Sequence, residues 1–209
     1  MGHERSFSMI LFTSKPLISL FDTIAFIKQE ATQIIVKGIS FSSDDEEASL
    51  EYLYSIGLGH AKRGKPRDAI FYFDKVLMVK PTHANALFNK GNALGKLGKY
   101  EDAILVYDTV LKTRPTHTVA LLNKGLALHY LQRYDEAISC YDKILAQEQE
   151  NANALYHKAC SKALQKNITD ALALLERAVI IDSEYAIKAS IDKDFGILQD
   201  NERFKALVA

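Results

Sequence analysis

A repeat of 34 residues runs through most of this 209-residue chain. The segment Leu87–Gly91 recurs as Leu121–Gly125, and the segment Tyr100–Ile104 recurs as Tyr134–Ile138. Following the same step in both directions gives four units, at 50–83, 84–117, 118–151 and 152–185. A fixed period of this length indicates one supersecondary unit that is stacked on copies of itself.

Several positions of the unit keep one side-chain size. Position 4 is leucine and position 20 is alanine in all four units, while position 8 is small and position 24 is large. The small residues are Gly57, Gly91, Gly125 and Ala159, and the large ones are Phe73, Tyr107, Tyr141 and Leu175. Spacings of three, four and seven return to one side of a helix, and small residues let two helices approach closely.

The ends of the predicted helices are marked by turn and proline residues. Gly98 and Gln132 begin the turn between the two helices of a unit. Pro81 and Pro115 end the second helix, because proline lacks an amide proton and disfavours helix in the residue before it. Each unit is therefore predicted to be a helix-turn-helix hairpin.

These features resemble the tetratricopeptide repeat over residues 50–185. The resemblance implies an all-α, right-handed superhelical solenoid. Two departures are visible. Leucine stands at position 4 instead of the tryptophan that the family favours, and in unit four Lys162 and Ser183 replace a large apolar residue and a proline.

The two ends of the chain differ from the repeats. Residues 1–43 are expected to form an N-terminal segment with an amphipathic helix at about 15–37, before repeats at 44–185. That helix could cover the first repeat, pair with a second copy of the chain, or lie on a membrane surface. Residues 186–209 are predicted to be a C-terminal capping helix, with Phe195 and Phe204 among its apolar residues.

Composition and motif spacing exclude several functions. Twenty-six basic residues balance 26 acidic ones, so no net charge draws the chain to nucleic acid. Cys140 and Cys160 are too few for a disulfide framework and too far apart in sequence for zinc-ligand spacing, so we expect a cytoplasmic protein without a metal. No phosphate-binding loop or catalytic constellation is found, so we expect neither a cofactor nor enzymatic activity.

The resemblance also implies a binding surface, because the outward positions of the first helices line a concave peptide-binding groove in this family. The corresponding residues here are Tyr54, Phe88, Asn89, Asn92, Lys96, Leu122, Asn123, Leu126, Tyr130, Asn153, Tyr156 and His157. Asparagine amides can hold an extended backbone, since each has donor and acceptor groups. The clamp by which some members bind a chaperone's C-terminal carboxylate is not expected, because Phe88, Asn153 and His157 occupy its cation positions.

The sequence therefore predicts a non-catalytic protein-protein interaction module, an adaptor, scaffold or co-chaperone-like protein that binds a peptide or helix in this groove. The partner would be a protein or peptide, with no nucleic acid expected, and the N-terminal helix could mediate self-association. The alternative is a membrane-surface-associated assembly scaffold that uses that helix.

Overall fold

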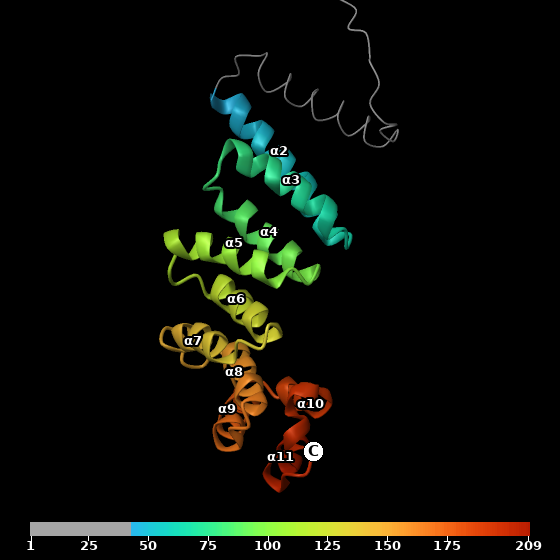
Figure 1. The fold of residues 1–209 in the computed structure, drawn as a ribbon, viewed down its shortest axis with the longest axis vertical. Helices are drawn as coiled ribbons and strands as arrows, with labels where there is room; N and C mark the ends of the chain where they lie inside the picture. The colour runs from blue at the N-terminus through green and yellow to red at the C-terminus, as the bar shows by residue number, and fades with distance from the viewer. Residues whose placement is uncertain (1–42) are drawn as a thin grey trace, which may run out of the picture. The chain divides into compact units, whose positions relative to one another are not determined.

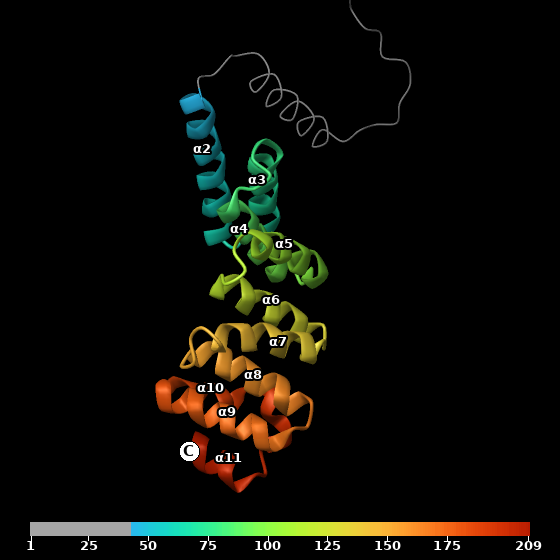
Figure 2. The same ribbon diagram turned by 90° about the vertical axis from the view of Figure 1, so that its left-hand side faces the viewer.

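A computed structural model of the chain describes residues 43–209, and all regular elements in this range are helical (Figures 1 and 2). The predicted helix at 15–37 lies outside the described residues. Eight helices form the repeats: α2 (Ser43–Lys62), α3 (Pro66–Val79), α4 (Ala84–Lys96), α5 (Tyr100–Thr113), α6 (Thr118–Tyr130), α7 (Tyr134–Leu145), α8 (Ala152–Leu164) and α9 (Ile168–Ile181). Three shorter helices follow: α10 (Glu184–Ile191), the 3-10 helix η1 (Lys193–Leu198) and α11 (Glu202–Val208).

The repeat helices pack in sequence order, each against the helix before and after it, as Figures 1 and 2 show for α3 to α9. This arrangement is the helical solenoid that the sequence predicts. The buried residues form successive clusters along the array, and each cluster joins side chains from neighbouring repeats.

The small residue at position 8 and the aromatic residue at position 24 contact each other within a repeat. A Cβ atom added to Gly91 would lie 2.6 Å from the ring of Tyr107, and one added to Gly125 would lie 2.5 Å from the ring of Tyr141. The corresponding distance from Gly57 to Phe73 is 2.7 Å. The aromatic ring therefore lies directly on the backbone of the first helix, which is why these repeats require glycine there.

The turns and caps repeat as well. Position 15, between the two helices of a unit, has a positive φ in every repeat, at Gly64, Gly98, Gln132 and Lys166. The residue at position 34 of the first three repeats caps the first helix of the repeat that follows it. His83 and His117 accept a hydrogen bond from a backbone N–H through Nδ1, and Asn151 does so through Oδ1.

An ion pair also recurs between neighbouring repeats. Lys90 lies 2.6 Å from Asp74, and Lys124 and Lys158 each lie 2.5 Å from the equivalent aspartates, Asp108 and Asp142. Each pair joins position 7 of one repeat to position 25 of the repeat before it, so the same contact links successive hairpins.

The C-terminal residues turn back onto the last repeats. Phe195, Leu198 and Phe204 are fully buried, in one cluster with side chains of α8 and α9. η1 packs against α8, while α10 and α11 pack against α9 and each other. We call residues 184–209 the C-terminal segment.

Candidate binding site

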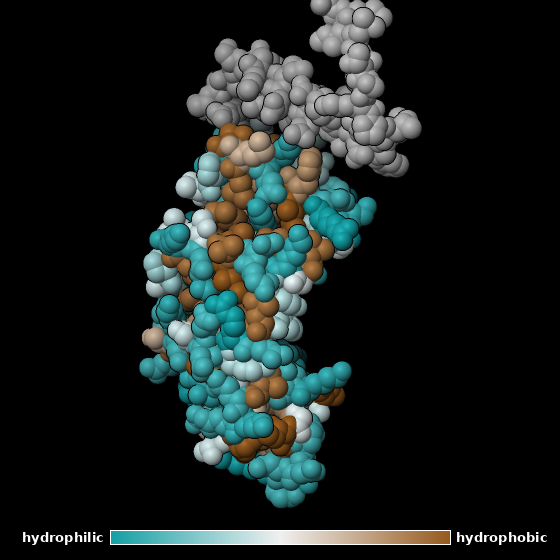
Figure 3. All heavy atoms as spheres, viewed as in Figure 1, coloured by the Kyte–Doolittle hydropathy of each residue, from teal (hydrophilic) through white to brown (hydrophobic). Residues whose placement is uncertain are grey.

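A pocket of about 570 Å³ opens beside the first helices of the first three repeats. We call it the asparagine pocket, because Asn89, Asn92 and Asn123 lie in its wall. Its remaining lining residues are Leu58, Ala61, Lys62, Pro66, Ala93, Gly95, Lys96, Tyr100, Tyr107, Leu126, Ala127 and Tyr130. The helices α2 to α5 also carry much of the apolar surface on the face seen in Figure 3.

Hydrogen bonds orient the three asparagines. Asn92 accepts through Oδ1 from the hydroxyl of Tyr107 at 2.8 Å and from the amide of Asn123, also at 2.8 Å. The amide of Asn89 donates to the hydroxyl of Tyr54 at 2.9 Å. Because its Oδ1 is already used, Asn92 presents an amide donor without an intramolecular acceptor among the described residues, and Asn89 and Asn123 retain carbonyl acceptors.

Aromatic and basic side chains complete the pocket. The rings of Tyr100 and Tyr130 stack with centroids 5.0 Å apart, and Tyr130 is 63% exposed. Lys62 and Lys96 are exposed. Burial raises the pKa of Tyr107, whose hydroxyl donates to Asn92, so this group stays a neutral donor.

Six of the predicted site residues line this pocket: Asn89, Asn92, Lys96, Asn123, Leu126 and Tyr130. The predicted site residues at position 5 of the repeats do not line this pocket. Tyr54 packs against the ring of His83, Phe88 packs against the ring of His117, and Leu122 packs against the core of the third repeat. In the first two repeats position 5 therefore contacts the histidine that caps the following repeat, and the side chains of Tyr54, Phe88 and Leu122 are only partly exposed.

The residues predicted from unit four have different surroundings. Asn153 is exposed near the loop between α7 and α8, away from the asparagine pocket. Tyr156 is fully buried, because the C-terminal segment covers it. This corrects the prediction that Tyr156 faces an open groove. His157 lies between the rings of Tyr141 and Tyr156.

Hydrogen bonds hold the C-terminal segment on α6 and α8. The Tyr156 hydroxyl donates to Asp192 at 2.6 Å. His129 lies with Nε2 2.9 Å from Asp194 and Nδ1 2.9 Å from the hydroxyl of Ser161. His129 and Ser161 are buried, so this contact joins the third repeat, the fourth repeat and η1 in one polar cluster.

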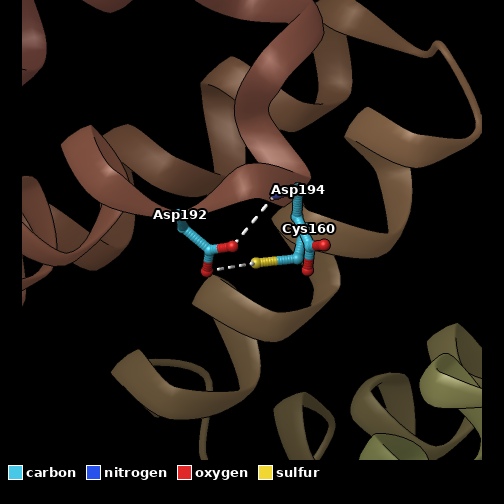
Figure 4. Close-up of side chains that lie close together, drawn as sticks. All are labelled: Cys160, Asp192 and Asp194. Carbon is cyan, nitrogen blue, oxygen red and sulfur yellow. Dashed lines mark hydrogen bonds between the residues drawn. The ribbon is translucent and has the colours of Figure 1, made fainter.

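Cys160, Asp192 and Asp194 form the one group among the described residues whose atoms are spaced to hold a metal ion, with ligand atoms within 4.8 Å of one another (Figure 4). Each carboxylate already has partners in the protein. Asp192 accepts from Tyr156 and from the backbone N–H of Asp194, and Asp194 contacts His129. These bonds account for the position of both carboxylates without an ion. Burial raises the pKa of the Cys160 thiol, and the two carboxylates raise it further.

The surroundings of His157 disfavour its protonated form. Burial lowers its pKa to about 3, with smaller effects of the same sign from Lys188 and His129. The imidazole is therefore neutral in the folded chain at ordinary pH.

Two family models match the sequence. The model described as anaphase-promoting complex, cyclosome, subunit 3 matches residues 62–144, and a tetratricopeptide repeat model matches residues 122–186. Together they span residues 62–186, from the end of α2 through α9. The chain belongs to the tetratricopeptide repeat family. Members of this family are typically non-catalytic modules for protein-protein interaction, and the family and the fold indicate a scaffold for such interactions.

Solved structures share the fold. "MamA 41-end from Desulfovibrio magneticus RS-1" is 24% identical, with a TM-score of 0.67 over 76% of this chain and 92% of that one. A tetratricopeptide repeat protein from Parabacteroides merdae is 20% identical, with a TM-score of 0.67 over 90% of this chain and 71% of that one. At these identities the likeness concerns the fold alone. No curated protein matched the sequence.

Sequence reasoning missed the polar cluster around His129, Ser161 and Asp194. Its members come from different repeats and from the aperiodic C-terminal segment, so no column of the repeat reveals them. Within residues 43–209, no helix has the length and apolarity required to cross a bilayer.

Proposed function

We propose that this tetratricopeptide protein binds an extended peptide or a short helix of a partner protein in the asparagine pocket. The observation that supports this most is the group of three asparagines with unused donor or acceptor groups, set among apolar side chains. An extended peptide presents N–H and C=O groups at regular intervals, which such amides can pair. The proposal includes a cytoplasmic location and no catalytic step.

The pocket also offers apolar contact area. Leu58, Leu126 and the exposed ring of Tyr130 line it beside the asparagines. Apolar side chains supply most of the favourable free energy of association, while hydrogen bonds fix the direction and register of the peptide. A segment that alternates apolar side chains with exposed backbone fits both requirements.

Selection from a random peptide library displayed on phage, with the full chain as target, tests this proposal. Selected peptides should bind the wild-type chain, and Leu126→Ser should weaken that binding at least several-fold. Leu105→Ser is the matched control, because Leu105 is 67% exposed on α5 and does not line the pocket. Circular dichroism checks that both variants fold.

A photo-crosslinking amino acid at position 126 or at position 105 gives a second readout. We expect the selected peptide to crosslink from position 126 and not from position 105. Peptides that bind both leucine variants equally, or failure to select any peptide, would count against the pocket as the binding site.

A further inference from the structure

The charged side chains that line the asparagine pocket are all of one sign. Lys62 and Lys96 contribute positive charge, and no aspartate or glutamate is among the lining residues. Both lysines are exposed, and no carboxylate of residues 47–209 forms an ion pair with either. The lysines at position 7 differ, since Lys90, Lys124 and Lys158 each pair with an aspartate of the preceding repeat.

The two lysines also occupy equivalent places. Lys62 and Lys96 both stand at position 13 of their repeats, near the end of the first helix, and Tyr130 stands at that position in the third repeat. Repeated stacking therefore sets two ammonium groups and an exposed aromatic ring in a row along the pocket. An anionic side chain next to an apolar one complements such a row.

The contacts of the C-terminal segment show which side chains bind the surface next to the asparagine pocket. It places Asp192 against the Tyr156 hydroxyl and Asp194 against His129, and it buries Phe195 beside the ring of Tyr156 with centroids 5.7 Å apart. His129 directly precedes Tyr130 of the pocket, with the two rings edge to face at 5.9 Å. An acidic and aromatic stretch of this chain thus binds the surface next to the pocket.

We propose that the asparagine pocket selects a peptide segment of a partner protein in which an aspartate or glutamate is next to a large apolar residue. The carboxylate pairs with Lys62 and Lys96, while the apolar side chain packs against Leu126 and Tyr130. This inference rests on the proposed function, to which it adds the chemistry of the partner.

The peptides selected on the full chain provide the test. One selected peptide, labelled with a fluorophore, is titrated with wild-type chain, with Lys62→Gln/Lys96→Gln and with Lys112→Gln/Lys143→Gln. The last variant is a matched control, because Lys112 and Lys143 are exposed lysines of second helices that do not line the pocket. A random single-stranded oligonucleotide is titrated in parallel as another anionic probe.

We expect the selected peptides to be enriched in acidic residues beside apolar ones. The pocket double variant should bind about tenfold more weakly, with a reduced dependence on salt, and the control should bind like the wild type. Peptides that crosslink from position 126 but lack acidic residues, or keep their affinity for the pocket double variant, would overturn this inference and leave the proposed function intact.

Two other outcomes have equally distinct meanings. Selected peptides that are insensitive to both Leu126→Ser and the lysine substitutions would overturn the proposed function and this inference together. Oligonucleotide binding that is lost in the pocket double variant, without acidic peptides being selected, would assign the lysines to nucleic acid instead of a peptide.

Discussion

The contact between positions 8 and 24 shows how one side chain determines another in this repeat. The ring of Phe73, Tyr107 or Tyr141 occupies the space that a Cβ atom would need on the neighbouring first helix. In unit four the pair is Ala159 and Leu175, both fully buried. The smaller leucine leaves room for the alanine methyl group, so the two positions vary together.

Gly91→Ala should therefore destabilise the chain, even though alanine favours helix by about 1 kcal/mol over glycine. The added methyl group would lie 2.6 Å from the Tyr107 ring, whose hydroxyl is fixed by Asn92 at 2.8 Å. Overpacking in a core costs roughly 1–3 kcal/mol, so after the gain in helix propensity we expect a net loss of up to about 2 kcal/mol in urea unfolding.

Gly95→Ala is the matched control on the same helix. A Cβ atom there has no neighbour within 4 Å outside its own helix, so this variant should gain up to about 1 kcal/mol. Gly91→Ala/Tyr107→Leu copies the Ala159–Leu175 pair of unit four and should recover part of the loss. Equal stability of the two alanine variants would contradict the packing argument.

The positive φ at position 15 leads to a second substitution. Gln132 has a φ of 60°, where a side chain costs about 1 kcal/mol, and it is exposed. Gln132→Gly should raise the free energy of unfolding by up to about 1 kcal/mol, measured by urea denaturation. Gly98→Ala, at a φ of 72° in the preceding repeat, should lower it by about the same amount. A stabilising Gly98→Ala would show that the turn changes conformation.

At this level the sequence predicts packing better than polar contacts. The side-chain sizes at positions 8 and 24 predict two closely packed helices. The structure shows that the ring at position 24 lies against the glycine at position 8. His83 and His117 were recognisable only as equivalent positions, whereas the structure shows them as N-caps. Asparagine is a common N-cap residue, so Asn151 at the third such position was the sequence signal for a cap at this position of the repeat.

Among the helices, α10 and η1 depart most from the repeat pattern. A regular repeat would continue the stack after α9, but the chain passes η1 across α8 and buries Tyr156. The bond from Tyr156 to Asp192 joins residues 36 apart, and the contact of His129 with Asp194 has no counterpart in other repeats. A contact that does not recur from repeat to repeat cannot be inferred from the 34-residue period. The sequence therefore did not predict that the C-terminal segment covers Tyr156.

The C-terminal segment should protect the thiol of Cys160. This side chain is 1% exposed, and both burial and the two nearby aspartates raise its pKa. In a Cys140→Ser background, Ellman's reagent should modify Cys160 very slowly in the intact chain. Asp192→Ala/Asp194→Ala should speed the reaction at least tenfold, because the segment is held less firmly and the thiolate is less disfavoured.

A variant that leaves the segment bound is the control for this experiment. Lys193→Ala changes an exposed residue between the two aspartates and should leave the rate unchanged. If the double variant reacts as slowly as the intact chain, while circular dichroism shows both folded, the aspartates do not hold the segment over Cys160.

Along the array, each repeat depends on its neighbours for stability, so a change in one repeat affects the unfolding of those beside it. The largest buried cluster joins the fourth repeat to the C-terminal segment. His157 lies at this end, between two tyrosine rings and near Lys188. A proton that binds His157 only in the unfolded chain lowers the stability of the folded state. This histidine lies at the end of the array that contains the largest buried cluster.

The chain should consequently lose stability on mild acidification. The pKa of His157 is lowered to about 3 in the folded chain, against an ordinary value of 6.5. Between these values the unfolded chain binds a proton that the folded chain does not, so stability falls as pH drops from about 6.5 toward 3 and is unaffected above that window. At pH 5 the loss at this site is at most about 2 kcal/mol.

Urea unfolding at pH 7.5 and pH 5 measures this loss of stability. His157→Gln should remove this part of the loss, whereas His117→Asn, which keeps a cap acceptor as Asn151 does, should retain it. An unchanged acid response in His157→Gln would place the sensitive group elsewhere.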